Sequence, residues 1–268
     1  MICEAMSCVG RAGTGRANPP MVIVRGNGGE LFEVYLKSPH FHVKKSSFVV
    51  EREWMAAKLA LALDLPCAPP VKVHLSQEFI ASMADRQLQR QLLSGPEIIF
   101  GSLSAGSGWN IWTEAAHMPR NKLALATSIY LFDTVIQNWD RCMPNPNLLQ
   151  KGDDLLLIDH EEAFVEATGS DAEKDYQKAP WVRGAISNHT GYDLEHPLWR
   201  KLHPATQVDF QQAAATWKRL PSDAFTLYAR DAPACWSSHA TFAIADYLSN
   251  ATQRIDEITA LIEYNFSR

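Results

Sequence analysis

Residues 138–164 read NWDRCMPNPNLLQKGDDLLLIDHEEAF, and this stretch decides the predicted fold. It places Asp140 and Asn145 in a D-x4-N spacing on an irregular, proline-containing segment that follows an apolar helix. Two short apolar strands around a Gly-Asp turn come next, and Asp159 ends the second strand. Phosphoryl transfer requires groups of this kind in this order. One carboxylate reaches the attacking hydroxyl, and an amide and a second carboxylate hold Mg²⁺ on the nucleotide phosphates. The stretch therefore predicts a site for phosphoryl transfer.

The D-x4-N spacing alone is weak evidence, because short motifs occur by chance. Asp133 and Asn138 form a second such pair, which we interpret as incidental to the helix that carries it. The alternative for the first pair is a local ion pair between Asp140 and Arg141, with Asp159 as the cap of a strand. The loop position of Asp140 and the later carboxylate of Asp159 together favour the catalytic interpretation.

Upstream of this stretch, the pattern indicates strands around one helix. Residues 21–25 (MVIVR) and 31–37 (LFEVYLK) flank a GNGG turn, which is typical of a β-hairpin. Residues 50–65 show helical periodicity that Pro66 ends. Further strands are predicted at residues 71–75 and 97–103.

The chain changes character at SLSAGSG, residues 102–108, whose serines and glycines disfavour regular structure. Beyond it the chain is predicted to be mostly helical. Residues 123–138 are apolar around most of the helix circumference, which predicts a buried helix. Residues 196–268 read as helices separated by prolines, the last of them a single helix from Thr241 to Phe266.

The motif N-x-D-R-x-x-x-N-x-N-L-L, followed by L-I-D-H-x-x-A-F, resembles the HipA-like kinases, small relatives of the HipA toxin kinase with kinship to phosphoinositide kinases. A G-R-A-x-x-G-x-x-N-P-P start at residues 10–20 and a D-L-P-x-A-P-P helix exit at residues 64–70 also match. The FGS sequence resembles the interlobe connector of that family, and its Phe100 and Gly101 would lie beside the nucleotide.

The resemblance implies an α+β, two-lobed protein-kinase-like fold. We expect residues 1–101 to form a small strand-rich N-lobe that carries the phosphate-binding lysine. We expect residues 102–268 to form a larger helical C-lobe with the catalytic loop and the metal-binding hairpin.

The resemblance also implies a role for each candidate residue. Asp140 would position or deprotonate the acceptor hydroxyl, and Asn145 and Asp159 would bind Mg²⁺. Lys37 would contact the α- and β-phosphates of ATP, and Glu53 would orient Lys37 through an ion pair.

Reasoning from the residues leaves alternatives open in the N-terminal part. Lys37 follows a glycine-rich hairpin, where a point charge suits phosphate, but an exposed edge-strand lysine would look the same. Glu51 competes with Glu53 for the pairing role, and either could simply favour the helix dipole. Gly28 and Gly29 could contact the nucleotide or only form a tight turn.

The expected activity is Mg-ATP-dependent transfer to a Ser/Thr hydroxyl. One alternative is a pseudokinase, a nucleotide-binding interaction protein with a toxin–antitoxin-type partner. Another is a small-molecule kinase for a lipid, sugar or antibiotic. A P-loop NTPase is excluded because the chain has no G-x-x-x-x-G-K-[ST] motif, and no G-x-S-x-G supports a serine hydrolase.

The overall composition is that of a globular protein. Twenty-five Lys+Arg against 30 Asp+Glu give a net charge of −5, which disfavours direct nucleic-acid binding. No signal peptide or apolar run of about 20 residues is found, so no membrane partner is expected. Five cysteines without a C-x-x-C motif favour a reducing, cytoplasmic location. We therefore expect the partner to be a protein or small-molecule acceptor.

Overall fold

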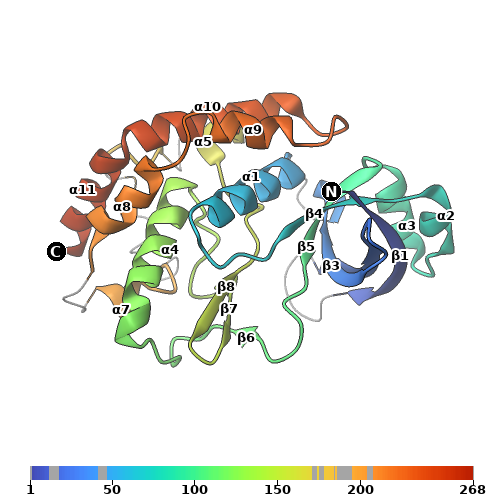
Figure 1. The fold of residues 1–268 in the computed structure, drawn as a ribbon, viewed down its shortest axis with the longest axis horizontal. Helices are drawn as coiled ribbons and strands as arrows, with labels where there is room; N and C mark the ends of the chain where they lie inside the picture. Colours follow the sequence, from blue (N-terminus) through green and yellow to red (C-terminus); the bar gives the residue numbers. More distant parts are fainter. Residues whose placement is uncertain are drawn as a thin grey trace.

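The protein combines a strand-rich N-terminal region with a helical C-terminal region, as the α+β prediction requires (Figure 1). The structure, a computed structural model, describes residues 2–11, 18–41, 47–170, 174, 178–183, 185, 195–203 and 208–267. Residues 12–17, the centre of the G-R-A-x-x-G-x-x-N-P-P start, lie outside the described residues.

Five strands close into a barrel in the N-terminal region, in the order β1-β2-β3-β5-β4. They are β1 (Ile2–Arg11), β2 (Pro20–Arg25), β3 (Leu31–Lys37), β4 (Pro70–His74) and β5 (Ile98–Leu103). The last four confirm the predicted strands. β1 was not predicted, because only its Cys3 and Ala5 are buried and its apolar alternation is weak. It forms by pairing with β2 and, in parallel, with β4, a strand about 70 residues away in the chain.

The hairpin of β2 and β3 has the predicted turn, with Gly29 in the left-handed region at φ 86°. β3 lies between β2 and β5, so Lys37 is not on an edge strand. Lys37 pairs with Phe100 across the sheet, and Leu36 pairs with Gly101. A Cβ on Gly101 would lie 2.9 Å from the Cγ2 of Val73, which explains the glycine at this close approach.

Helices of the N-terminal region flank the barrel: α1 (Val49–Ala62), α2 (Gln77–Ser82) and α3 (Arg86–Leu93), with a 3₁₀ turn at Pro39–Phe41. The sequence predicted only α1. The other two are short and begin at side-chain caps, since Ser76 accepts from the backbone N–H of Phe79 and Asp85 accepts from that of Leu88. Caps of this kind also occur in loops, so they did not identify the helices by themselves.

The C-terminal region contains one small sheet and several helices. The sheet joins β6 (Asn110–Ile111), β7 (Leu148–Lys151) and β8 (Asp154–Leu157) in that order. The helices are α4 (Leu123–Val135), α5 (Val165–Thr168), α7 (Trp199–Leu202), α8 (Phe210–Lys218), α9 (Ala224–Arg230), α10 (Ser238–Gln253) and α11 (Ile255–Phe266), with a 3₁₀ turn at Arg120–Lys122. The prediction of one final helix was wrong, because the helix breaks at Arg254.

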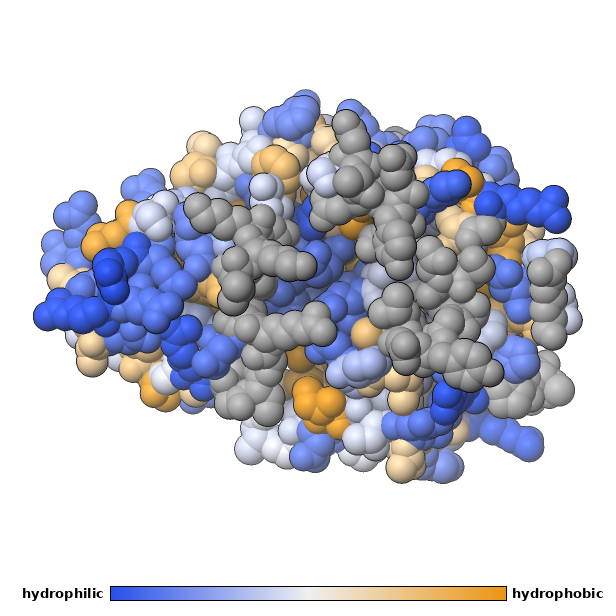
Figure 2. All heavy atoms as spheres, turned by 180° about the vertical axis from the view of Figure 1, so that it is seen from behind, coloured by the Kyte–Doolittle hydropathy of each residue, from blue (hydrophilic) through white to orange (hydrophobic). Residues whose placement is uncertain are grey.

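Within the described part of the chain, no helix has the length and apolar character needed to cross a membrane. On the face turned away from the viewer in Figure 1, the visible hydrophobic side chains lie scattered among hydrophilic ones (Figure 2). Scattered apolar residues of this kind are normal on a protein surface.

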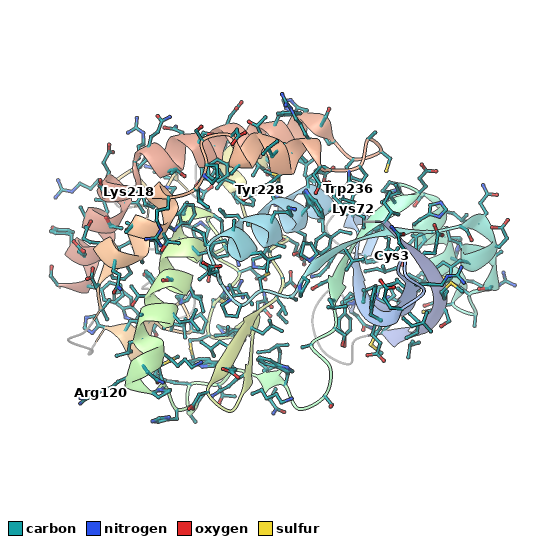
Figure 3. The ribbon with its side chains drawn as sticks, in the orientation of Figure 1. Cys3, Lys72, Arg120, Lys218, Tyr228 and Trp236 are labelled. Carbon is teal, nitrogen blue, oxygen red and sulfur yellow. The ribbon has the colours of Figure 1, made fainter. Side chains whose placement is uncertain are left out.

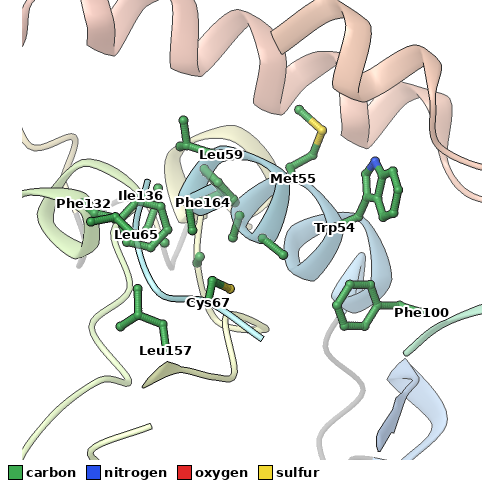
Figure 4. Packing of buried hydrophobic residues seen from close by; sticks show 14 of the residues in the cluster. Trp54, Met55, Leu59, Leu65, Cys67, Phe100, Phe132, Ile136, Leu157 and Phe164 are labelled. Carbon is green, nitrogen blue, oxygen red and sulfur yellow. The ribbon is translucent and has the colours of Figure 1, made fainter. Parts of the chain in front are cut away.

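Helix α1 lies between the barrel and the C-terminal helices, where it packs against α9 and α10 (Figure 1). Its apolar side chains join the buried cluster that also contains Phe132 and Phe164 (Figure 4). The Trp54 indole N–H donates to the Tyr228 carbonyl at 2.9 Å. The Trp236 indole N–H donates to the Ile98 carbonyl at 2.6 Å, so the start of α10 also holds the barrel.

A cation–π contact and an ion pair, both made by Lys72, strengthen this attachment; Figure 3 labels this lysine. Lys72 of β4 lies over the Trp54 ring, with Nζ 4.7 Å from the centroid, and its Nζ is 2.7 Å from Asp231 Oδ1. These contacts join the barrel, α1 and the loop after α9. They fix the position of α1 relative to the barrel.

Candidate functional site

Three carboxylates surround the ammonium group of Lys37. Its Nζ is 2.7 Å from Asp159 Oδ2, 3.2 Å from Glu161 Oε2 and 3.3 Å from Glu53 Oε1. Lys37 is 5% exposed, which rules out the alternative of an exposed edge-strand lysine. Burial lowers the pKa of Lys37, but Asp159, Glu53 and Glu161 outweigh burial and raise that pKa well above its ordinary value. Lys37 is therefore a fixed positive charge at the end of β3.

Helix α1 buries three consecutive charged residues, Glu51, Arg52 and Glu53, and each has its own partner. Glu53 faces Lys37 and forms an ion pair with it, and its role in orienting Lys37 towards a nucleotide stays a prediction. Glu51 points elsewhere, and its Oε1 accepts from the backbone N–H of Ser237 at 2.6 Å. The competition between the two glutamates is therefore decided in favour of Glu53.

Asp159 follows β8 and adopts a left-handed backbone conformation, with φ 60°. Aspartate tolerates this conformation better than most residues. Asp159 and Glu161 both reach Lys37, whereas His160 between them is buried against the Phe132 ring at a centroid separation of 5.8 Å. Glu161 was not predicted. Its only signal in the sequence was its position two residues after Asp159, and the left-handed backbone of Asp159 means that strand alternation does not apply there.

The D-x4-N loop is held together by its own side chains. The Asn145 amide Nδ2 donates to Asp140 Oδ2 at 2.6 Å, and the Asn147 Nδ2 donates to the same oxygen at 3.2 Å. Asn147, with φ 43°, was not predicted as a site residue. Because Asn145 donates through Nδ2, its Oδ1 is the atom that suits a metal ion.

Arg141 does not pair with Asp140, so the alternative of a local ion pair is wrong. Its Nε donates to Asp133 Oδ2 at 2.7 Å, and its Nη1 donates to the Asn147 carbonyl and, at 3.1 Å, to the Ile158 carbonyl. Both residues of this buried ion pair are fully enclosed. Arg141 thus connects helix α4 to the D-x4-N loop and to the strand end that precedes Asp159.

The second D-x4-N pair has a structural role that the sequence interpretation missed. The Asn138 Nδ2 donates to Asp133 Oδ1 at 3.2 Å, and Asp133 Oδ2 also lies 3.0 Å from His196 Nε2. The backbone N–H of Leu198 donates to His196 Nδ1, so the neutral ring carries its proton on Nε2 and donates it to Asp133. Asp133 therefore gathers the loop residue Arg141 and the distant segment of His196 around one carboxylate.

The buried group of Asp133, Arg141 and His196 is expected to make the folded protein less stable in acid. Burial lowers the pKa of His196 below its ordinary value of 6.5. Burial raises the pKa of Asp133, but the Arg141 charge and the His196 hydrogen bond lower it to about 2. Both pKa values are depressed by folding, so the unfolded chain takes up protons first and stability falls as the pH falls.

The free energy of unfolding should decrease as the pH is lowered through about 6.5, and again below about 4, where Asp133 contributes about 2 kcal/mol. Urea unfolding at a series of pH values measures both decreases. The His196→Gln variant keeps an N–H donor for Asp133 without a titrating ring, so its upper decrease should shrink. An unchanged upper decrease in that variant would assign it to other groups.

The remaining predicted residues do not join the carboxylate cluster. Gly28 and Gly29 are exposed in the β2–β3 turn. Phe100 is buried in the core, and Gly101 lies against Val34 and Val73. Their predicted role beside the nucleotide stays a prediction.

Glu53, Asp159 and Glu161 offer carboxylate oxygens that all lie within 4.8 Å of one another. Three carboxylates and one ammonium give −3 + 1 = −2, a local charge that favours a divalent cation. Oxygen ligands of this kind suit Mg²⁺. Asp159, one of the two predicted Mg²⁺ ligands, belongs to this set, whereas the other predicted ligand, Asn145, does not.

Comparisons with known proteins find similarity to kinases. A family model described as HipA-like kinase matches residues 7–180. A crystal structure of a Helicobacter pylori proinflammatory kinase, CtkA, superposes with a TM-score of 0.55 over 98% of this chain and 97% of that chain, at 14% sequence identity. Identity this low supports the kinase-like fold alone. No protein in a search of curated sequences matches the chain.

Proposed function

We propose that this chain, which belongs to the HipA-like kinase family, transfers the γ-phosphoryl group of Mg-ATP to a Ser/Thr hydroxyl of a protein. The family and the fold of the kinase neighbour support a phosphotransferase. The single observation that carries the finer proposal is the convergence of Lys37, Glu53 and Asp159, from three distant parts of the sequence, at one buried point.

Each residue has a defined task in this proposal. Lys37, oriented by Glu53, neutralises charge on the nucleotide phosphates. Asp159 and Asn145 would hold the metal, which would supply positive charge beside the transferred phosphoryl group. Asp140 accepts the proton of the acceptor hydroxyl, and its hydrogen bonds from Asn145 and Asn147 fix the carboxylate in place.

We further propose that the two regions act as kinase lobes, with residues 1–101 contacting the nucleotide and residues 102–268 carrying the catalytic loop. Lys37 belongs to the first region and Asp140 to the second. The site therefore lies where the regions meet, as Lys37 and Asp159 already contact each other. Positions between two lobes are common ligand sites.

Mg-ATP should stabilise the folded protein. A ligand at 100 times its dissociation constant contributes about 2.7 kcal/mol, which raises the melting temperature by several degrees. The measurement is a thermal melt with ATP and Mg²⁺, and EDTA should reduce the shift because the cation neutralises the carboxylate cluster. Absence of any shift at millimolar Mg-nucleotide would refute nucleotide binding.

A further inference from the structure

Three carboxylates crowd around the ammonium group of Lys37. A lysine ammonium has three N–H donors. Asp159, Glu161 and Glu53 lie within 2.7–3.3 Å of Nζ, and Nζ donates a hydrogen bond to Glu161 Oε2. Lys37 is only 5% exposed, so these carboxylates enclose most of the ammonium group. A phosphate oxygen can bind Lys37 closely only if one of these carboxylates gives up its place.

The three carboxylates differ in how they are held. Glu53 is on α1, its side chain is 2% exposed, and α1 is fixed by Glu51 and Trp54. Asp159, with a side chain 25% exposed, is the carboxylate expected to hold the metal. Glu161 is the third carboxylate, and the proposed roles assign the orientation of Lys37 to Glu53 and the metal to Asp159 and Asn145, although Glu161 also lies within 4.8 Å of the other two carboxylates.

The main chain holds Glu161 beside Lys37. The Arg52 Nη1 donates to the Glu161 carbonyl at 3.2 Å, and Arg52 Nε donates to Thr168 Oγ1 at 2.9 Å. Arg52 is 2% exposed and precedes Glu53 in α1. The same helix therefore presents Glu53 to Lys37 and fixes the backbone from which Glu161 reaches Lys37. A rotation of the Glu161 side chain can break its contact with Lys37 without disturbing this backbone anchor.

We propose that Glu161 is an internal counter-ion of Lys37 that a nucleotide phosphate displaces, and that it thereby sets the nucleotide affinity of the site. This proposal rests on the proposed function. A carboxylate attached to the protein competes for the lysine at a high effective concentration. Its negative charge also repels the incoming phosphates. Both effects weaken nucleotide binding, so Glu161 acts as a specificity and affinity determinant and is not needed for the transfer itself.

The test compares ATP binding to the whole chain and to Glu161→Gln by calorimetric titration, with Mg²⁺ and again with EDTA. The variant keeps the side-chain shape and removes the charge, so the dissociation constant should fall by at least about tenfold in both conditions. Glu161→Ala should change in the same direction. Glu33→Gln, which removes one charge from an exposed position of β3, should bind like the unaltered protein.

Weaker Mg-ATP binding by Glu161→Gln, with more Mg²⁺ needed for half-saturation, would overturn the proposal and make Glu161 a metal ligand. An unchanged dissociation constant would also overturn it. Binding by the variant but not by the unaltered protein would support it in its strongest form. If neither protein binds ATP while both melt cooperatively, the proposed function itself fails, and this inference fails with it.

Discussion

Replacing Asp140 by asparagine is expected to reduce phosphoryl transfer by about a thousandfold, because a general base contributes roughly 10²–10⁴ in rate. The affinity for Mg-ATP should stay within a few-fold of the unaltered value. Asp140 Oδ2 accepts hydrogen bonds from Asn145 and Asn147, and the Oδ1 of the new asparagine can accept them in its place. The loop should therefore keep its shape while it loses the group that takes the proton.

Asp159→Asn is the matched comparison. Asparagine tolerates the left-handed backbone at this position, so the change adds little strain. It removes a charged metal ligand and the 2.7 Å ion pair with Lys37. Both Mg-ATP affinity and turnover should therefore fall. One substitution weakens ground-state binding, and the other acts mainly on the transition state.

Calorimetric titration of Mg-ATP and a radiolabelled phosphate assay, on generic protein substrate and on the chain itself, distinguish these roles. Loss of nucleotide binding in Asp140→Asn, with binding retained in Asp159→Asn, would reverse the assignment. Normal transfer by both variants would make the D-x4-N motif a coincidence of spacing.

Lys37→Met should lower transfer at least about a hundredfold, because positioning and charge neutralisation supply most of this catalysis. The substitution keeps most of the side-chain volume. It also leaves the carboxylates of Glu53, Asp159 and Glu161 facing one another without the ammonium. Removal of one partner from a buried ion network costs about 3–5 kcal/mol, so the melting temperature should fall as well.

Magnesium separates these two effects of Lys37→Met. A divalent cation can take the place of the lost charge among the carboxylates, so Mg²⁺ should raise the melting temperature of the variant more than that of the unaltered protein. Transfer should stay low, because the phosphates still lack the lysine. The control is Lys218→Met, an exposed lysine paired with Asp256, which should leave transfer unchanged. An unaltered transfer rate in Lys37→Met would show that the lysine serves only the fold.

The residues of the D-x4-N loop could be placed near one another from the sequence because their relations are local. Asp140, Asn145 and Asp159 lie within one loop and one hairpin, so their spacing along the chain constrains their positions in space. Lys37 was found for a similar reason, from a short strand after a glycine-rich turn. The predicted pair of Lys37 with Glu53 required knowledge of the family, since nothing local connects β3 to α1.

Other features depend on contacts between distant segments, which a pattern of residues does not contain. β1 is a strand because β2 and β4 supply its hydrogen bonds, and its own apolar pattern is weak. Asp133 holds the D-x4-N loop in place because Arg141 and His196, from two other segments, both contact its Oδ2. A buried carboxylate on an apolar helix gave no sign of those partners.

The sequence by itself determined the α+β class, the barrel hairpin, helix α1 and the order of acidic and amide groups that predicts phosphoryl transfer. Turn chemistry and the period of apolar residues fix such features within a few residues. Only the tertiary structure decided between Glu51 and Glu53, because they are two steps apart in one helical turn and the partner of each comes from elsewhere. Glu51 accepts a hydrogen bond from the backbone N–H of Ser237, and Glu53 forms an ion pair with Lys37. The contact of Glu161 with Lys37 is also visible only in the structure. It requires β3, β8 and α1 to come together around Lys37, whose buried charge must be neutralised.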